Sequence, residues 1–439
     1  MRALYLGLAA LLATSGGAAA AEQACHVGLY RFEDGQVIDV SFTAQDKLRW
    51  QRIDGRTGVI QPAEGAARIS HGGWTDEADG VRISLPPCTE RAITVDGQVA
   101  RKVDFEVTDT RFKGAGGIEL AGRLVLPKGA GKVPIVVIGH GSEDTSALKL
   151  YDEQRLYPSQ GVGAFLFDKR GTGGSGGKYS QDFELLAQDV AAAVAEARRL
   201  AGARAGRVGL EGASQGGWII PLAATKTQVD FVLVDYGLTI DPWAENLAET
   251  VQDLEAKGWG PADVAKGREM GAAASNLVAS KFGEAEMAAW DALRTKYQAE
   301  PWYKDLEGEF TGMLAPHAAP QAKAAALAHP IFHANTTWRH DSLGVLRRVK
   351  APVLWIIAGS DTVAPPEQTE KDLETLIKEG RDIRAAVFPG TDHGIRQFTV
   401  KDGERAFSRY ADGYTALRID WIKGAPLKAV YGQATFIGR

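Results

Sequence analysis

One serine lies in a stretch of very small residues, in the order Gly212-Ala213-Ser214-Gln215-Gly216. An apolar run typical of a buried strand precedes the stretch, and the apolar run "WII" follows it as the start of a helix. In a strand-to-helix turn, G-x-S-x-G holds a serine in a strained conformation, with its hydroxyl exposed at a helix N-terminus. The pattern therefore predicts a nucleophile at Ser214, although a short glycine-rich turn would carry the same letters.

A nucleophilic serine needs a base, and the base needs a group that orients it. His393 opens a loop after a predicted strand, in "FPGTDHGI", and Asp361 follows another predicted strand, in "LWIIAGSDTVAPP". Only one histidine lies beyond Asp361, and the order serine, acid, histidine is that of one known hydrolase arrangement. Asp392 competes as the acid, but its position next to His393 is poor for orienting the ring. We expect Ser214, Asp361 and His393 to form a catalytic triad.

Two hydrogen-bond donors must hold the oxyanion of a tetrahedral intermediate. The backbone N–H of Gln215, directly after the nucleophile, is one candidate, and the N–H of Ser142 in the earlier loop "VVIGHGSEDT" is the other. His140 in this loop can brace the backbone, and no chemistry is assigned to it. Glu143 and Asp144 are close in sequence to Ser142, so the local electrostatics are expected to be unusual.

The elements that carry these residues belong to an α/β pattern in residues 103–240 and 348–439. Short apolar runs of the kind buried on both faces of a sheet alternate with helical periodicity, as in the predicted helix over residues 180–200. Strands that alternate with helices predict a mostly parallel, doubly wound sheet. The expected strands after the first two lie at residues 133–140, 162–168, 207–212, 229–237, 351–359 and 383–390.

Residues 241–347 interrupt this alternation. The segment has no strand-like run and contains five of the ten tryptophans, so we expect a helical insertion that acts as a lid. Its aromatic side chains either form the insertion's own core or line a substrate pocket over the serine, where they would select an apolar group. The pocket candidates are Trp243, Trp259, Trp302 and Phe332.

Residues 22–102 are expected to form a small β-rich module. Alternating runs such as "QVIDVSF" have the strand period of two, and four Asp-Gly pairs favour hairpin turns. The only two cysteines of the chain, Cys25 and Cys88, lie at the ends of this module. In an oxidising compartment they are expected to form one disulfide, although two free thiols remain the alternative.

Residues 1–21 have the features of a secretory signal peptide. A positive Arg2 precedes an apolar stretch too short to span a bilayer, and Ala19-Ala20-Ala21 fits a small-residue cleavage site. An uncleaved anchor is the alternative. Cleavage would remove one positive charge and no acidic residue, so the formal net charge would change from −5 to −6. We expect an exported, periplasmic or secreted protein with no membrane span in its mature chain and no nucleic-acid partner.

The pieces "VIGHGSEDT", "FLFDKRGTGGSGG", "LEGASQGGW", "LWIIAGSDTVAPP" and "FPGTDHGI" resemble the α/β-hydrolase superfamily in sequence and order. The "DKRGTGGS" element and the position of the insertion resemble the serine aminopeptidase-like and bile-acid-CoA acyltransferase-like branch. This resemblance covers residues 103–425 and implies a Ser-His-Asp hydrolase with a lid between the sixth and seventh strands. It implies nothing about the N-terminal module.

A second glycine pattern, G-x-G-x-x-G at residues 171–176, also follows a predicted strand. A dinucleotide site would need an acidic residue at the end of another strand about 20 residues later, and here that spacing reaches Asp189 inside a helix. A phosphate-binding P-loop would need Ser or Thr where Tyr179 follows Lys178. We therefore interpret the segment as a hydrolase loop and expect neither a cofactor nor a metal.

The expected activity is hydrolysis of a small carboxylic ester or thioester through an acyl-enzyme on Ser214. A serine aminopeptidase would use the same residues and is the alternative within this class. A hydrolase-like domain that only binds a partner is the alternative outside it, and an intact triad disfavours it. The sequence gives no indication of the oligomeric state.

Overall fold

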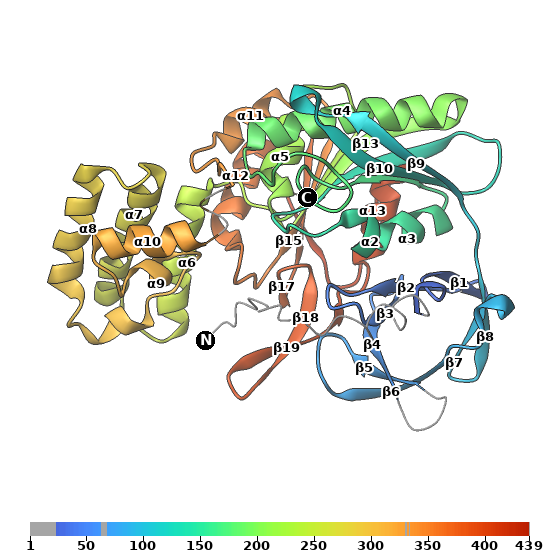
Figure 1. Cartoon of the computed structure of the whole chain (residues 1–439), viewed down its shortest axis with the longest axis horizontal. Helices are drawn as coiled ribbons and strands as arrows, with labels where there is room; N and C mark the ends of the chain where they lie inside the picture. The colour runs from blue at the N-terminus through green and yellow to red at the C-terminus, as the bar shows by residue number, and fades with distance from the viewer. Residues whose placement is uncertain (1–22, 63–67, 330–331, 333, 439) are drawn as a thin grey trace.

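Three parts of the molecule are distinct in Figure 1: a β barrel at the N-terminus, a central sheet covered by helices, and a separate group of helices to one side. The structure is a computed structural model, and it describes residues 23–62, 68–329, 332 and 334–438. The predicted signal peptide, residues 1–21, lies outside the described residues.

The N-terminal part is a closed barrel of eight antiparallel strands, because β8 pairs with β1 as well as with β7. Alternate apolar side chains, among them Tyr30, Ile38 and Trp50, point inward and form the barrel core. Asp-Gly pairs make three of the hairpin turns, after β1, β3 and β7. The strands are β1 Gly28–Phe32, β2 Val37–Phe42, β3 Leu48–Arg52, β4 Thr57–Pro62, β5 Arg68–Gly72, β6 Ala78–Ser84, β7 Ala92–Val95 and β8 Gln98–Lys102.

The fourth Asp-Gly pair does not form a hairpin turn. Asp79 and Gly80 lie inside β6, where the Asp79 carboxylate accepts a hydrogen bond from the N–H of Val81 at 2.9 Å. The pairing of β5 with β6 is irregular at this point. The side-chain-to-backbone turn that Asp-Gly favours is thus present, but it makes an irregularity within a strand instead of reversing the chain.

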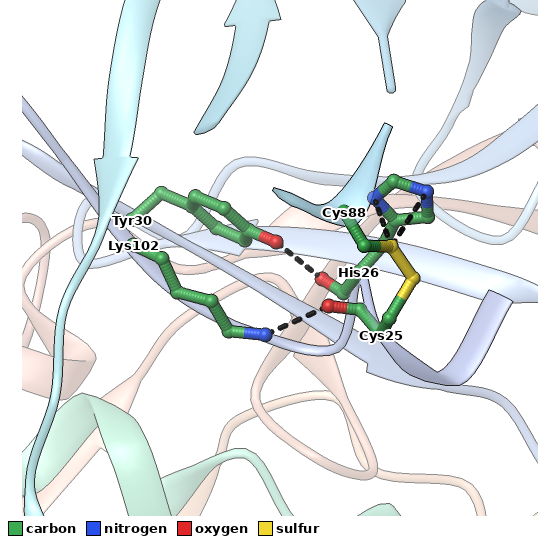
Figure 2. The surroundings of a disulfide bond; sticks show 5 residues. All are labelled: Cys25, His26, Tyr30, Cys88 and Lys102. Atoms are coloured by element: carbon green, nitrogen blue, oxygen red, sulfur yellow. Dashed lines mark hydrogen bonds between the residues drawn. A yellow bond between two sulfur atoms is a disulfide. The ribbon is translucent and has the colours of Figure 1, made fainter. Parts of the chain in front are cut away.

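A disulfide joins Cys25 to Cys88, as the sequence predicts, with 5.9 Å between the Cα atoms. It ties the segment before β1 to η1, Cys88–Glu90, which precedes β7. Figure 2 shows the surrounding contacts: Lys102 Nζ donates to the carbonyl of Cys25, and the Tyr30 hydroxyl donates to the carbonyl of His26, each at 2.8 Å. The disulfide therefore ties the segment before β1 to η1, and the two hydrogen bonds hold this segment against the first and last strands of the barrel.

The central sheet has nine strands in the order β20-β16-β15-β14-β13-β11-β12-β10-β9. The six central strands, β16, β15, β14, β13, β11 and β12, pair in parallel with their neighbours. At one edge β20 pairs antiparallel with β16, and at the other edge β10 pairs antiparallel with both β12 and β9. The strands are β9 Glu106–Lys113, β10 Glu119–Leu126, β11 Val133–Gly139, β12 Gly163–Phe167, β13 Ala205–Ala213, β14 Val232–Asp235, β15 Val353–Ala358, β16 Ile383–Phe388 and β20 Thr435–Ile437.

Helices cover both faces of this sheet, and this confirms the predicted doubly wound α/β fold. Helices α4, α5, α11 and α12 contribute to the apolar core on one face, and α3 and α13 contribute to the core on the other. The Asp182 carboxylate caps α4 by accepting from the N–H of Leu185. The helices are α2 Ala147–Leu150, α3 Glu153–Ser159, α4 Phe183–Ala201, α5 Gly216–Ala224, α11 Ser342–Arg348, α12 Pro366–Lys378 and α13 Tyr414–Lys423.

The group of helices at one side in Figure 1 comes from the chain between β14 and β15, the sixth and seventh strands of the sheet in chain order. These helices pack around their own apolar core, which contains Trp290 and Trp302. They are α6 Pro242–Ala256, α7 Pro261–Ala279, α8 Glu284–Tyr297, α9 Thr311–Leu314 and α10 Ala319–Ala328. No helix in the described part of the chain is long and apolar enough to cross a membrane.

A small third sheet follows β16, and it is not among the elements predicted from the sequence. It contains β17 Thr391–Asp392, β18 Arg396–Lys401 and β19 Glu404–Tyr410. The hairpin turn falls at Asp402 and Gly403, between two alternating runs. An Asp-Gly pair flanked by such runs is a hairpin pattern, so the sequence did contain the information to predict this element.

Candidate active site

Three side chains from separate loops meet at the carboxyl ends of the parallel strands. His393 Nε2 lies 3.1 Å from Ser214 Oγ, and His393 Nδ1 lies 2.9 Å from Asp361 Oδ2. The hydroxyl, imidazole and carboxylate thus form one continuous hydrogen-bonded line. The structure brings together the three residues that the sequence predicts as a triad, and this arrangement can activate a hydroxyl for attack on an acyl carbon.

The backbone around Ser214 is strained and tightly packed. Ser214 has a positive φ of 54°, which is uncommon for a residue with a side chain. Its N–H donates to the carbonyl of Asp235 at 2.9 Å, which fixes the turn to the neighbouring strand β14. A Cβ on Gly217 would lie 2.9 Å from the Cα of Gly237, so only glycine lets α5 begin so close to the end of β14. The small residues of the motif therefore position the serine at the start of α5.

Asp361 is held by the turn that follows β15. Its Oδ1 accepts hydrogen bonds from the N–H groups of Val363 and Ala364 at 2.9 and 2.8 Å, which leaves Oδ2 for His393. The carboxylate side chain is only 2% exposed. Because its orientation is fixed on both oxygens, it can hold the imidazole in a single tautomer.

Asp392, the other acid considered, has a different place. Its carboxylate accepts from the N–H groups of Thr362 and His393 at 2.9 and 2.8 Å and pairs with Arg405 of β19 at 2.8 Å. Burial opposes its ionisation, but these hydrogen bonds and the arginine hold the pKa of Asp392 below its ordinary value. Asp392 therefore ties the loop that carries His393 to the loop that carries Asp361.

Two further residues contact His393, and neither was predicted from the sequence. The ring of Tyr236, just after β14, packs edge-on against the imidazole with 4.8 Å between centroids. The Arg396 Nε donates to the carbonyl of His393 at 2.5 Å, and its guanidinium lies over the ring of Trp74 from the barrel. The histidine loop is thus held by the core on one side and by the barrel on the other.

The predicted oxyanion loop lies against the nucleophile. A Cβ added to Gly141 would lie 3.7 Å from Ser214 Cβ and 2.8 Å from Glu143 Oε2, so the serine and this carboxylate both lie against Gly141. Burial opposes ionisation of Glu143, but His140, Tyr151 and Lys169 lower its pKa to about 2. A negative charge therefore lies in the predicted oxyanion loop, where the acidic residues of the sequence predict unusual electrostatics.

His140 braces this loop. It is 4% exposed, and its Nε2 accepts a hydrogen bond from the N–H of Lys169 at 2.7 Å. The ring proton must then be on Nδ1, which lies 3.2 Å from Glu143 Oε1. Burial lowers the pKa of His140, so the ring is neutral.

The aromatic candidates for a substrate pocket belong to the helical insertion. Trp259, Trp302 and Phe332 contribute to its core, and Trp302 is fully buried between Tyr297 and Tyr303. Trp243 lies at the start of α6, where its Nε1 donates to Asn276 and the guanidinium of Arg339 covers its ring. Gln252 of α6 reaches the triad, because its Nε2 donates to the carbonyl of Asp361 at 2.9 Å.

The residues that a dinucleotide or metal site would use are bound to other residues of the protein. Asp189 is 1% exposed and forms a two-point ion pair with Arg170, with both distances at 2.7 Å. Among the described residues, one group of three potential metal ligands lies close together, Cys25, His26 and Cys88. Both thiols of this group are used by the disulfide, so it does not offer a thiolate site.

Comparison with known families matches residues 116–393 to X-Pro dipeptidyl-peptidase (S15 family). Curated proteins give no match. Among solved structures, the acylaminoacyl peptidase of Pyrococcus horikoshii aligns at 18% identity over 81% of this chain and 52% of its own, with a TM-score of 0.40. An esterase of Pyrococcus furiosus aligns at 14% identity over 66% of this chain and 83% of its own, with a TM-score of 0.39.

A puromycin-hydrolyzing peptidase of Mycobacterium tuberculosis aligns at 17% identity over 83% of this chain and 51% of its own, with a TM-score of 0.39. The chain thus spans about half the length of each of the two peptidases that it resembles in structure.

Proposed function

The chain belongs to the S15 family of serine hydrolases, and we propose that Ser214 is its nucleophile and that the reaction proceeds through an acyl-enzyme. The observation that carries this proposal is the line of hydrogen bonds from Asp361 through His393 to Ser214. The strained serine at the start of α5 supports it, because this position faces the positive end of a helix.

In the proposed mechanism, Ser214 Oγ attacks the acyl carbon while His393 Nε2 takes the hydroxyl proton. Asp361 keeps the imidazole oriented and stabilises its positive charge. The N–H groups of Ser142 and Gln215 hold the oxyanion of the tetrahedral intermediate. The intermediate collapses, His393 returns the proton to the leaving group, and a water molecule then releases the acyl group by the same steps in reverse order.

We propose carboxylic esters or thioesters as the substrates that the geometry supports best. An alkoxide or thiolate leaves the tetrahedral intermediate more readily than an amine does, so the triad alone suffices for these bonds. The partly exposed aromatic residues of the insertion, Trp243, Trp259 and Phe332, are the candidates for contacts with the acyl group, and each added CH₂ that they bury would contribute about 0.8 kcal/mol.

Peptide hydrolysis is the second candidate. The family description favours it, and so does the ionised Glu143 beside Ser214, since a carboxylate there can pair with the free ammonium group of a peptide substrate. Such a pair would place the first residues of a peptide across the serine.

A substrate panel tests both candidates. Nitrophenyl esters from acetyl to octanoyl would be compared with aminoacyl and dipeptidyl nitroanilides, using the wild type and Ser214→Ala. We expect Ser214→Ala to lose turnover by on the order of a millionfold and a fluorophosphonate probe to label Ser214 alone. A flat ester profile with rapid anilide cleavage would favour the peptidase, and full activity of Ser214→Ala would refute the proposed nucleophile.

We also propose that the protein is exported and that its mature chain begins near Glu22. The predicted signal peptide supports this, and so does the disulfide, because disulfides persist in oxidising compartments. Intact-mass measurement of the protein from a host that exports it tests the proposal. A retained N-terminus or two alkylatable thiols without reductant would contradict it.

A further inference from the structure

The glycine-rich loop between β12 and α4 folds back onto the predicted oxyanion loop. Gly171 has a φ of 73°, and a Cβ there would collide with the backbone nitrogen of Tyr179. The N–H of Gly171 donates to the carbonyl of Gly176 at 2.9 Å, which closes the loop. As a result, Lys169 and Tyr179, at the two ends of the loop, lie next to each other and next to Ser142.

Lys169 is a buried cation that is bound to a backbone carbonyl. Lys169 is only 3% exposed, and its Nζ donates a hydrogen bond to the carbonyl oxygen of Gly141 at 2.7 Å. That carbonyl belongs to the same peptide group as the N–H of Ser142. An ammonium on the oxygen draws electron density from the peptide group, so the N–H at its other end becomes a stronger donor.

Tyr179 holds the other side of the same residue. Its hydroxyl donates to the carbonyl of Ser142, and Gln181 Nε2 donates to the hydroxyl oxygen at 2.6 Å. The Lys169 ammonium also lies 4.7 Å from the centre of the Tyr179 ring, an attractive cation–π position. The carbonyls before and after the Ser142 N–H are therefore both fixed by side chains of one loop.

We propose that Lys169 is a positioning residue of the oxyanion hole, where it orients and polarises the Gly141–Ser142 peptide group, and that Tyr179 completes the clamp. This inference rests on the proposed function, because it takes the Ser142 N–H as an oxyanion donor. It also gives the glycine-rich loop a role in the reaction, which the sequence pattern alone did not suggest. The stabilisation appears only when the oxyanion forms, so it lowers the activation barrier without tightening substrate binding.

The charge of Lys169 makes this contribution dependent on pH. Burial lowers the pKa of Lys169 to about 8, against the attraction of Glu143 and Asp144 in the facing loop. The other titratable groups against it are Tyr179 and His140, and the latter is neutral. Lys169 therefore carries its full charge below pH 7 and loses it as the pH rises through about 8.

The test compares Lys169→Met, which keeps the length of the side chain without its charge, with Lys169→Arg and Tyr179→Phe. With an activated ester at pH 7, we expect Lys169→Met to lower kcat by about tenfold or more and to change KM by less than twofold. Complete removal of an oxyanion donor costs about a hundredfold to a thousandfold, which is the upper bound. Tyr179→Phe should lower kcat about threefold, and Lys178→Met, at an exposed lysine of the same loop, should match the wild type.

Three readouts separate this role from a merely structural one. The wild type should lose kcat above about pH 8, Lys169→Arg should move this loss to higher pH, and Lys169→Met should lack it. Affinity for a trifluoromethyl ketone, which forms a tetrahedral oxyanion on the serine, should fall in Lys169→Met by the same factor as kcat. Affinity for a non-reacting amide analogue should stay within twofold.

A folded Lys169→Met variant with wild-type kcat at pH 7 would overturn the inference. If its thermal unfolding shows that this variant does not fold, Tyr179→Phe and the alkaline limb of Lys169→Arg decide, and wild-type behaviour of both would overturn it. Failure of the proposed function is a separate result, because then the wild type itself would show no labelling of Ser214 by a fluorophosphonate.

Discussion

The β barrel and the helical insertion both reach the loops that carry the triad, but they are attached to the sheet in different ways. The barrel meets the histidine loop through Trp74, which packs against Arg396, and its backbone bonds directly to β19. The insertion meets the acid loop through Gln252 and the start of α4 through Ala334 and Thr337, while its helices α6 to α10 pack around their own core. One neighbour is built into the site, and the other is a separately packed unit beside it.

Polar contacts fix the barrel to the hydrolase part. The carboxylate of Asp39 on β2 is fully buried and binds the guanidinium of Arg155 on α3 at 2.6 and 2.9 Å. The N–H of Trp74 donates to Phe407 at 2.9 Å, and the N–H of Tyr410 donates to Gly55 at 3.0 Å. Buried pairs and backbone bonds of this kind demand a single geometry, so the barrel is expected to be a rigid wall of the site.

The largest expected effect concerns this buried ion pair. Asp39→Ala leaves Arg155 buried without its partner, and breaking a buried pair in this way costs about 3–5 kcal/mol. Urea unfolding should show this loss in the transition that includes both the barrel and the hydrolase part. Asp46→Ala is the matched control, since its pair with Lys149 joins the same two parts at the surface and is worth less than about 1 kcal/mol.

Equal losses in the two variants would mean that the ion pair contributes nothing beyond surface attraction. Separate unfolding transitions for the barrel and the hydrolase part would contradict the view that the barrel is built into the site.

Removal of the disulfide, which lies within the barrel module, has the next largest expected effect on the free energy of unfolding. The bond closes a sequence separation of 63 residues, so replacing both cysteines by serine should lower the free energy of unfolding by about 4 kcal/mol in the chain-entropy view. The triad lies outside this loop, and we expect kcat at 25 °C to stay within twofold of the wild type. Thermal unfolding with and without reductant measures the first quantity, and ester turnover measures the second.

Loss of turnover in the folded double variant would show that the barrel end near the disulfide, and not only its Trp74 side, shapes the site. An unchanged unfolding free energy would show that the barrel core alone stabilises this part.

Local patterns explain why so much of the catalytic end could be predicted. Short segments determine the strand before Ser214, the turn around it and the loops that carry Asp361 and His393. In each of them the local sequence is enough to predict the local conformation. The contacts of Asp39 with Arg155 and of Gln252 with Asp361 join residues 116 and 109 positions apart, and no local pattern specifies them. Closure of the barrel could not be predicted from a local pattern either, because the pairing of β1 with β8 depends on how the whole module curves.

The two side chains that brace His393 carry no recognisable motif. Tyr236 follows β14, and the fold brings its ring to the imidazole across a long sequence separation. Arg396, the first residue of β18, is only three residues from His393 and binds its carbonyl, but a single arginine does not specify this contact. By contrast, the β18–β19 hairpin was missed although its Asp402-Gly403 turn is a local signature. Long-range contacts could not be predicted from local sequence patterns, whereas this hairpin could have been.

The smallest expected effect concerns the insertion and its contact with the acid loop. Gln252→Ala removes the hydrogen bond to the carbonyl of Asp361, which positions the triad from one side, while Val363 and Ala364 still hold the carboxylate itself. We therefore expect kcat to fall by only about twofold to fivefold, corresponding to roughly 0.5–1 kcal/mol, the usual scale of a single neutral hydrogen bond. Gln188→Ala is the control, because this exposed glutamine donates to Glu184 on its own helix α4.

The measurement is kcat for esters of increasing acyl length. A uniform loss for all esters would mean that the insertion acts through the acid loop, and a loss that grows with acyl length would mean that it contacts the substrate. A loss above a hundredfold would contradict the comparison, because the insertion would then be as much a part of the site as the barrel is.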